Sequence, residues 1–88
     1  MAVFVDDAAI VYRGKPRYHL MADSLEELHA FAQAAGIHRC WFHNTRNYPH
    51  YDITGEQRQV ALAVGAQPLS SRDMVRRFRN KGAVSTKP

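Results

Sequence analysis

The sequence has a single cysteine, Cys40, among 88 residues. An internal disulfide therefore cannot form, and a zinc site built only from cysteines is excluded. No apolar run approaches the roughly 20 residues that span a bilayer. Residues 1–7 have neither the basic start nor the long apolar stretch of a signal peptide. We expect a cytoplasmic protein that does not enter a membrane.

The sequence motifs of several enzyme classes are also missing. The chain has no glycine-rich dinucleotide loop, no Walker phosphate loop, no nucleophile elbow and no His-Glu-x-x-His zinc motif. The sequence therefore does not show whether the protein is an enzyme. Any catalytic site would consist of side chains that are scattered along the chain.

The length and the apolar content predict one small globular domain. A chain of 88 residues with 45% hydrophobic residues is too short for two domains and too apolar to be disordered. We expect the domain to span residues 1–80. Residues 81–88 show no apolar periodicity, so we expect a disordered C-terminal tail there.

The net charge of +4 is unevenly distributed along the chain. Six of the twelve basic residues follow Ser71, where Asp73 is the one acidic residue. These basic residues are Arg72, Arg76, Arg77, Arg79, Lys81 and Lys87. They form either a solvated helix face with a charged tail, or a surface that contacts the phosphate groups of a nucleotide or nucleic acid.

Three segments have helix signals. Ser24 followed by Glu27, and Thr54 followed by Gln57, match the capping box that begins a helix. A third helix begins at Ser70 or Ser71. The first helix has apolar residues at helical spacing, namely Leu25, Leu28, Phe31, Ala32 and Ala35.

Strand signals alternate with these helices. We expect strands over residues 1–5, 37–42 and 66–69, the last at a sheet edge because of Pro68. Residues 10–21 form either a hairpin or only one strand, over residues 18–21. The pattern predicts an α/β fold of two or three layers, with three helices and a mainly parallel sheet of roughly three to five strands. Ligands bind such sheets beyond the carboxyl ends of the strands.

Polar residues follow two of the expected strands. The adjacent carboxylates Asp6 and Asp7 repel each other, so they need a cation, a proton or open water, although a strand end capped by one of them would also account for the pair. His50 and Asp52 lie in a loop with His43. Histidine with carboxylate suits Zn²⁺, Mn²⁺ or Fe²⁺, or acid–base catalysis. We predict that Asp6 or Asp7 shares one cleft with His50 or Asp52.

The same loop offers groups that bind phosphate and stack on a base. Arg46 lies near Tyr51 in the sequence, and Arg58, Arg72 and Arg76 are further candidate ligand-binding residues. Three remaining residues favour structural roles. His29 lies at the border of the first helix's apolar stripe, His19 lies within a strand, and Cys40 behaves as a small buried apolar residue.

Several runs together resemble a known family. They are Val5-Asp6-Asp7-Ala8, His19-Leu20-x-x-Asp23, Glu27-Leu28-His29-x-Phe31-Ala32, Trp41-Phe42, Pro49-His50-Tyr51-Asp52, Gly65-Ala66 and Ser71-Arg72. In their order and spacing they are similar to the domain of unknown function 4031 family of small bacterial and phage proteins. The resemblance implies no activity. It implies that the polar residues among these runs belong to the family pattern, and that a phage source is plausible.

These observations lead to three functional hypotheses. The first is a domain that binds a phosphorylated ligand, a nucleotide or nucleic acid, at a polar cleft formed by Asp6, Asp7, His50 and Asp52. The second is a metal-dependent hydrolase or nuclease in which Asp6, Asp7, His50 and Asp52 hold a divalent metal and provide the catalytic groups. The third is a module that binds a host protein without catalysis.

Overall fold

The computed structural model describes residues 2–45 and 48–85, and side chains as far as residue 79. Its strands are β1 (Val3–Val5), β2 (Ile10–Tyr12), β3 (Lys15–Ala22), β4 (Phe42–His43), β5 (His50–Ile53) and β6 (Gln67–Pro68). Its helices are α1 (Leu25–Ala34), α2 (Gly55–Ala63) and α3 (Ser71–Ser85), with a short 3₁₀ turn, η1 (Arg39–Trp41).

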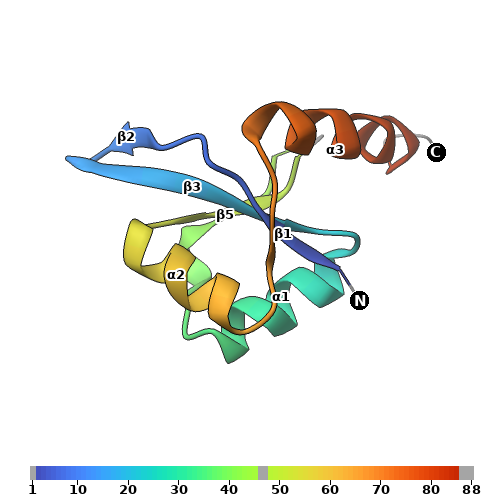
Figure 1. The fold of residues 1–88 in the computed structure, drawn as a ribbon. Helices are drawn as coiled ribbons and strands as arrows, with labels where there is room; N and C mark the ends of the chain where they lie inside the picture. Colours follow the sequence, from blue (N-terminus) through green and yellow to red (C-terminus); the bar gives the residue numbers. More distant parts are fainter. Residues whose placement is uncertain (1, 46–47, 86–88) are drawn as a thin grey trace.

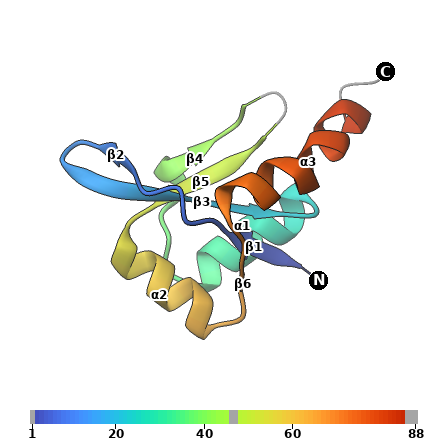
Figure 2. The same cartoon turned by 45° about the horizontal axis from the view of Figure 1, so that its top comes forward.

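The strands form one mixed sheet in the order β4-β5-β3-β1-β6, with β2 paired to β3 (Figures 1 and 2). Among the described strands only β1 and β6 pair in parallel, and the other pairs are antiparallel. The expectation of a mainly parallel sheet of three to five strands is therefore wrong, because the described sheet has six strands and is mostly antiparallel. The α/β class and the three helices are confirmed. β2 and β3, and β4 and β5, are joined by connections that are too short for the crossover that parallel pairing needs.

The hairpin between β2 and β3 resolves one alternative that the sequence leaves open. Tyr12 pairs with Lys15, so the turn consists of Arg13 and Gly14 alone. Both turn residues have positive φ angles, 54° and 78°. This is the type I′ geometry, which matches the twist of a two-residue hairpin.

Helices cover both faces of the sheet, α1 and α2 on one face and α3 on the other (Figure 1). The alternation of side chains along the strands separates two apolar clusters. The larger cluster joins Val5, Leu20 and Ile53 of the sheet to the buried residues of α1 and α2. The smaller cluster joins Phe4 and Met21 to Met74 and Phe78 of α3. The domain therefore has three layers.

The segment after α1 differs from the strand that the sequence predicts over residues 37–42. Ile37 is buried, but the chain then forms the turn η1, and β4 has only two residues. His38 accounts for the turn, because its Nδ1 accepts a hydrogen bond from the backbone N–H of Cys40. Cys40 itself is exposed, so its expected burial is wrong.

The helix caps follow the sequence signals. Ser24 Oγ accepts a hydrogen bond from the Glu27 N–H, and Thr54 with Gln57 forms a complete capping box. Ser70 caps α3, because its Oγ accepts from the Asp73 N–H. α3 continues to Ser85, beyond residue 81 where we expected the tail to begin. Residues 86–88 lie outside the described part of the chain, so disorder there stays a prediction.

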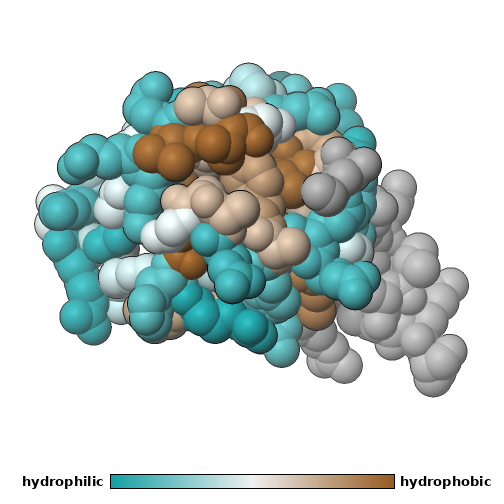
Figure 3. Space-filling model, turned by 90° about the horizontal axis from the view of Figure 1, so that it is seen from below, coloured by the Kyte–Doolittle hydropathy of each residue, from teal (hydrophilic) through white to brown (hydrophobic). Residues whose placement is uncertain are grey.

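Hydrophobic atoms gather on the face of the molecule that α1 and α2 form, within a more hydrophilic surface (Figure 3). Exposed hydrophobic residues of these helices and their ends include Leu25, Val60 and Val64. No helix in the described residues is both long enough and apolar enough to span a bilayer.

Candidate metal centre

Five ionisable side chains meet on the α3 side of the sheet, where strand register brings them together. His19 of β3 pairs with Asp52 of β5, and His43 of β4 pairs with His50 of β5. Asp6 follows β1 directly, and its N–H donates to the carbonyl of His19. Residues paired in this way point to the same face of the sheet. The apolar residues between them, Tyr51 and Ile53 among others, point to the opposite face and bury in the larger cluster.

Asp6 holds the ring of His19 in one orientation. Asp6 Oδ2 lies 2.7 Å from His19 Nδ1, and Asp6 Oδ1 accepts from the backbone N–H groups of His19 and Ala8 at 2.8 and 3.3 Å. A carboxylate accepts only, so His19 Nδ1 carries the proton of this bond. The second ring nitrogen of His19, Nε2, therefore points away from Asp6 toward Asp52, whose Oδ1 is 4.0 Å away.

His50 is oriented in the same way by a backbone carbonyl. Its Nδ1 lies 2.6 Å from the carbonyl oxygen of Tyr48, so Nδ1 carries a proton and donates it. Its Nε2 lies 3.3 Å from Asp52 Oδ1. The other carboxylate oxygen of Asp52, Oδ2, lies 2.9 Å from Nε2 of His43, which is at the exposed edge of the group.

The pKa values of the two oriented histidines shift in opposite directions. The hydrogen bond to Asp6 raises the pKa of His19 above its ordinary value, against the effect of burial, and the charges of Asp6 and Asp52 add to the rise. Burial lowers the pKa of His50, and the hydrogen bond to Tyr48 opposes this only in part. Burial would raise the pKa of Asp6, but the hydrogen bonds from His19 outweigh it and the pKa is lowered.

Burial thus favours a neutral His50, and a neutral His50 with its proton on Nδ1 has an unshared electron pair on Nε2. In that state the pair faces a carboxylate oxygen of Asp52 at 3.3 Å. Two unshared electron pairs at this distance repel each other unless a proton or a metal cation lies beside them. His19 Nε2 faces the same carboxylate oxygen, and ligand atoms of His19, His50 and Asp52 all lie within 4.8 Å of one another.

These three residues fit a divalent transition metal. Two imidazoles and one carboxylate are a ligand set of Zn²⁺ and of non-haem Fe²⁺, and three protein ligands leave positions open for water or substrate. Metal-bound histidines characteristically donate their other ring N–H to a carboxylate or a carbonyl. His19 donates to the Asp6 carboxylate and His50 to the Tyr48 carbonyl, so both have that outer partner.

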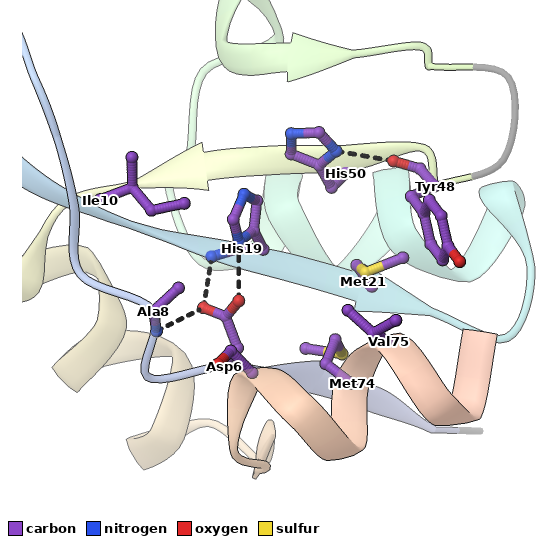
Figure 4. Close-up of a pocket in the computed structure, with 10 residues that line it drawn as sticks. Asp6, Ala8, Ile10, His19, Met21, Tyr48, His50, Met74 and Val75 are labelled. Carbon is purple, nitrogen blue, oxygen red and sulfur yellow. Dashed lines mark hydrogen bonds and ion pairs between the residues drawn. The ribbon is translucent and has the colours of Figure 1, made fainter. Parts of the chain in front are cut away.

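A cavity of about 500 Å³ adjoins this group, between α3 and the sheet (Figure 4). Asp6, His19 and His50 line it together. The structure thus places Asp6 and His50 in one cleft, which is the arrangement that we predict from the sequence. The route to it differs from the prediction, because the residues meet on the face of an antiparallel region and not at the carboxyl ends of parallel strands.

Asp7, the neighbour of Asp6, points elsewhere. Its Oδ1 accepts from the backbone N–H of Ser71 at 2.9 Å, at the first residue of α3. It does not belong to the group of three ligand atoms. The two adjacent carboxylates therefore have different partners. Asp6 accepts hydrogen bonds from His19, and Asp7 accepts one from the first residue of α3.

Among the described residues, the candidate phosphate-binding side chains do not line this cavity. Tyr51 lies on the opposite face, where its hydroxyl is 2.8 Å from His29 Nδ1. Arg58 of α2 donates from Nε to the carbonyl of Asp6. Arg72 and Arg76 are exposed on α3. Arg46 lies outside the described residues.

A histidine within a strand favours a structural role, but the structure places His19 in the candidate metal centre. The signal that identifies it is alternation: Tyr18 and Leu20 pack in the larger cluster, so His19 must face the other side. The same rule in β5 turns His50 and Asp52 to that side. What the sequence did not supply was the pairing of β3 with β5, which brings the two sets together.

Comparison with known sequences agrees with the resemblance seen in the sequence. The model of a family described as "Protein of unknown function (DUF4031)" matches residues 3–81. No curated protein and no solved structure matches the chain. The match covers the whole described sheet, so the histidine and aspartate positions lie within the family region.

Proposed function

We propose that this chain, which belongs to the DUF4031 family, binds one divalent transition-metal ion through His19, His50 and Asp52 and acts as a metal-dependent hydrolase. One observation carries the proposal. Two imidazole nitrogens and a carboxylate oxygen face one another, while the other ring nitrogen of each histidine is already engaged.

The side chains around the three ligands have distinct tasks in this proposal. Asp6 keeps the proton of His19 on Nδ1 and so leaves Nε2 free to bind the metal. His43 holds the second oxygen of Asp52, which fixes the carboxylate plane. A metal with open positions lowers the pKa of its bound water to about 7 and so supplies hydroxide near neutral pH.

The donor atoms favour Zn²⁺ or Fe²⁺ over Mn²⁺, Mg²⁺ and Ca²⁺. Imidazole suits the first two ions, whereas Mn²⁺, Mg²⁺ and Ca²⁺ prefer oxygen donors. Two of the three donors here are imidazole nitrogens.

Metal content tests this proposal directly. After dialysis against Zn²⁺ and removal of excess, we expect about one Zn²⁺ per chain in the parent, and none retained by Asp52→Asn or His50→Gln. The control is His38→Asn, which changes an exposed histidine to a residue that also serves as an N-cap. Zinc retention by Asp52→Asn and His50→Gln equal to that of the parent would overturn the proposal.

Hydrolysis is tested with the same samples. The zinc form should hydrolyse p-nitrophenyl acetate faster than the metal-free form, with a rate that rises as the bound water loses its proton. The rate should return to that of the metal-free form in Asp52→Asn. Equal rates in the zinc and metal-free forms would leave a metal site without the hydrolytic function.

A second candidate is phosphate binding by α3, favoured by its exposed arginines. Arg72, Arg76 and Arg79 are all exposed on this helix. Nucleic acid would then contact the helix surface and not the cavity. Arg72→Ala with Arg76→Ala should reduce the salt dependence of any DNA or RNA affinity. An unchanged salt dependence would remove this candidate. Binding of a host protein stays a prediction.

A further inference from the structure

We infer that the cavity beside the metal centre binds the apolar body of a small organic substrate, whose reacting group is uncharged or carries one negative charge. The inference rests on the proposed metal site and adds the substrate class to it. The lining of the cavity is largely apolar around a few polar groups. Met21, Met74, Val75 and the ring of Tyr48 lie to one side of His19 and His50, and Ile10 and Ala8 lie to the other side (Figure 4).

The size and lining of the cavity fit a small molecule. Its volume of about 500 Å³ lies within the range of pockets that enclose organic ligands. Most ligand pockets combine apolar walls with a few polar groups that orient the ligand. Here the methionines supply adaptable apolar walls, and Asp6, His19 and His50 supply the polar groups.

The charge of the lining limits the reacting group. Within the described part of the chain, the residues that line the cavity include no arginine and no lysine. A phosphate monoester with two negative charges is usually held by such cations, most often by arginine. Asp6 and Asp52 already offset the charge of a divalent metal. A substrate group with no charge or one charge therefore fits better than a phosphate dianion.

The apolar wall is open to a ligand and firmly held in place. Val75 is 45% exposed and Ile10 is 55% exposed, although both line the cavity. Polar contacts at its first residue and at Arg77 hold the helix that carries Met74 and Val75. Ser71 N–H donates to Asp7, and Arg77 forms an ion pair with Asp23 at 3.0 Å.

Two hydroxamic acids with the same metal-binding head test the inference. Acetohydroxamate carries a methyl group and benzohydroxamate carries a phenyl group, and both would be titrated into the zinc-loaded protein. Burial of the larger apolar group should make benzohydroxamate bind roughly tenfold tighter or more. Both compounds bind the metal through the same head group, so its contribution to the binding free energy cancels in the ratio of the two dissociation constants. The ratio then reports the difference between the phenyl and methyl groups.

Val75→Asp should reduce that ratio to about threefold or less, because it places a carboxylate in the apolar wall. Since Val75 is partly exposed, the variant should fold, and its zinc affinity is measured first. Val64→Asp is the matched control: Val64 is 55% exposed, follows α2 and does not line the cavity, so the ratio should stay at the parent value.

The outcomes separate this inference from the proposed function. Zinc uptake with equal affinities for the two hydroxamates would overturn the substrate class and leave the metal site standing. A ratio that Val75→Asp does not change would also overturn it. Phenylphosphonate binding tighter than benzohydroxamate would refute the limit on charge. Absence of zinc uptake would overturn both the function and the inference.

Discussion

Asp6 is a buried carboxylate that acts on a neighbouring ring and does not itself contribute one of the three ligand atoms. Its side chain is 3% exposed and accepts three hydrogen bonds, two of them from His19. Because its charge holds the proton of His19 on Nδ1, it decides which nitrogen of that ring faces Asp52. Asp6 therefore differs in role from Asp7, although the two residues are adjacent and chemically identical.

Replacement of Asp6 by asparagine should weaken zinc binding about 10- to 100-fold. The amide oxygen would keep the hydrogen bonds from the backbone N–H groups of His19 and Ala8, so the NH₂ group would face Nδ1. Because NH₂ only donates, the ring would carry its proton on Nε2, where the metal is proposed to bind. A competition titration with a zinc chelator measures the change. Asp7→Asn is the control, because its side-chain oxygen still accepts from Ser71 N–H. Equal weakening in both variants would contradict the role given to Asp6.

His29 provides a pH test that does not involve the metal centre. Burial lowers its pKa, and burial raises the pKa of its partner Tyr51. A depressed histidine pKa means that the unfolded chain binds more protons below about pH 6.5. The contribution of His29 to the free energy of unfolding is therefore present above that pH and is lost as the pH falls through the folded-state pKa.

The parent should accordingly lose more stability than His29→Gln between pH 7 and pH 5. Urea midpoints at the two pH values measure this for both proteins. The other histidines remain in the variant, so the difference between the two losses belongs to residue 29. The same loss in both proteins would mean that the pKa of His29 is not lowered by folding.

Sequence reasoning at the residue scale found part of the site. Asp6, His50 and Asp52 were candidates because carboxylate and histidine lay next to predicted strands. His19 was missed by that reasoning because its role depends on partners 13 and 33 residues away, Asp6 and Asp52. The split between Asp6 and Asp7 was also beyond the sequence, since both have the same chemistry and only the position of α3 separates them.

At the scale of single elements, the sequence predicted the helix caps, because these depend on interactions between residues that are close in the chain. The caps at Ser24 and Thr54 are made within four residues, and the structure has both. The strand expected over residues 37–42 failed because a cap by His38 favours a turn that apolar content does not reveal. The expected stripe of α1 was also too wide, since Leu25 is 46% exposed and Leu28 is 1% exposed.

This difference within α1 gives a stability test with a built-in control. Leu28→Ala should cost roughly 2–5 kcal/mol of unfolding free energy, because it opens a cavity in the larger cluster. Leu25→Ala changes the same residue type on the same helix, and should cost less than about 1 kcal/mol. Denaturant unfolding measures both. Similar losses in the two variants would show that the face of α1 is assigned wrongly.

At the scale of the whole molecule, the two faces of the sheet carry different kinds of side chain. One face is apolar across β1, β3 and β5, and α1 and α2 cover it. On the other face α3 buries Phe4 and Met21, while the side chains from β4 and β5 are His43, His50 and Asp52. The polar group lies beside an open cavity between α3 and the sheet (Figure 4).

The sequence could not predict this arrangement, because it depends on strand order. Helices that alternate with strands suggested parallel crossovers, but β3 inserts between β1 and β5 and pairs antiparallel with both. That insertion carries His19 to Asp6 on one side and to Asp52 on the other. Pairing between strands that are distant in the chain depends on the packing of the whole sheet. No local sequence pattern therefore predicts it.

The nitrogen spectrum of the histidine rings during a zinc titration tests the central claim most directly. Two-bond ¹H–¹⁵N correlation reports the proton position in each of the five histidines of the chain. At a pH high enough for His19 to be neutral, we predict that His19 and His50 carry their proton on Nδ1. One equivalent of Zn²⁺ should then shift Nε2 of both rings and leave His29 and His38 unchanged. Protons on Nε2 of His19 and His50, or zinc shifts that bypass these two nitrogens, would contradict the account.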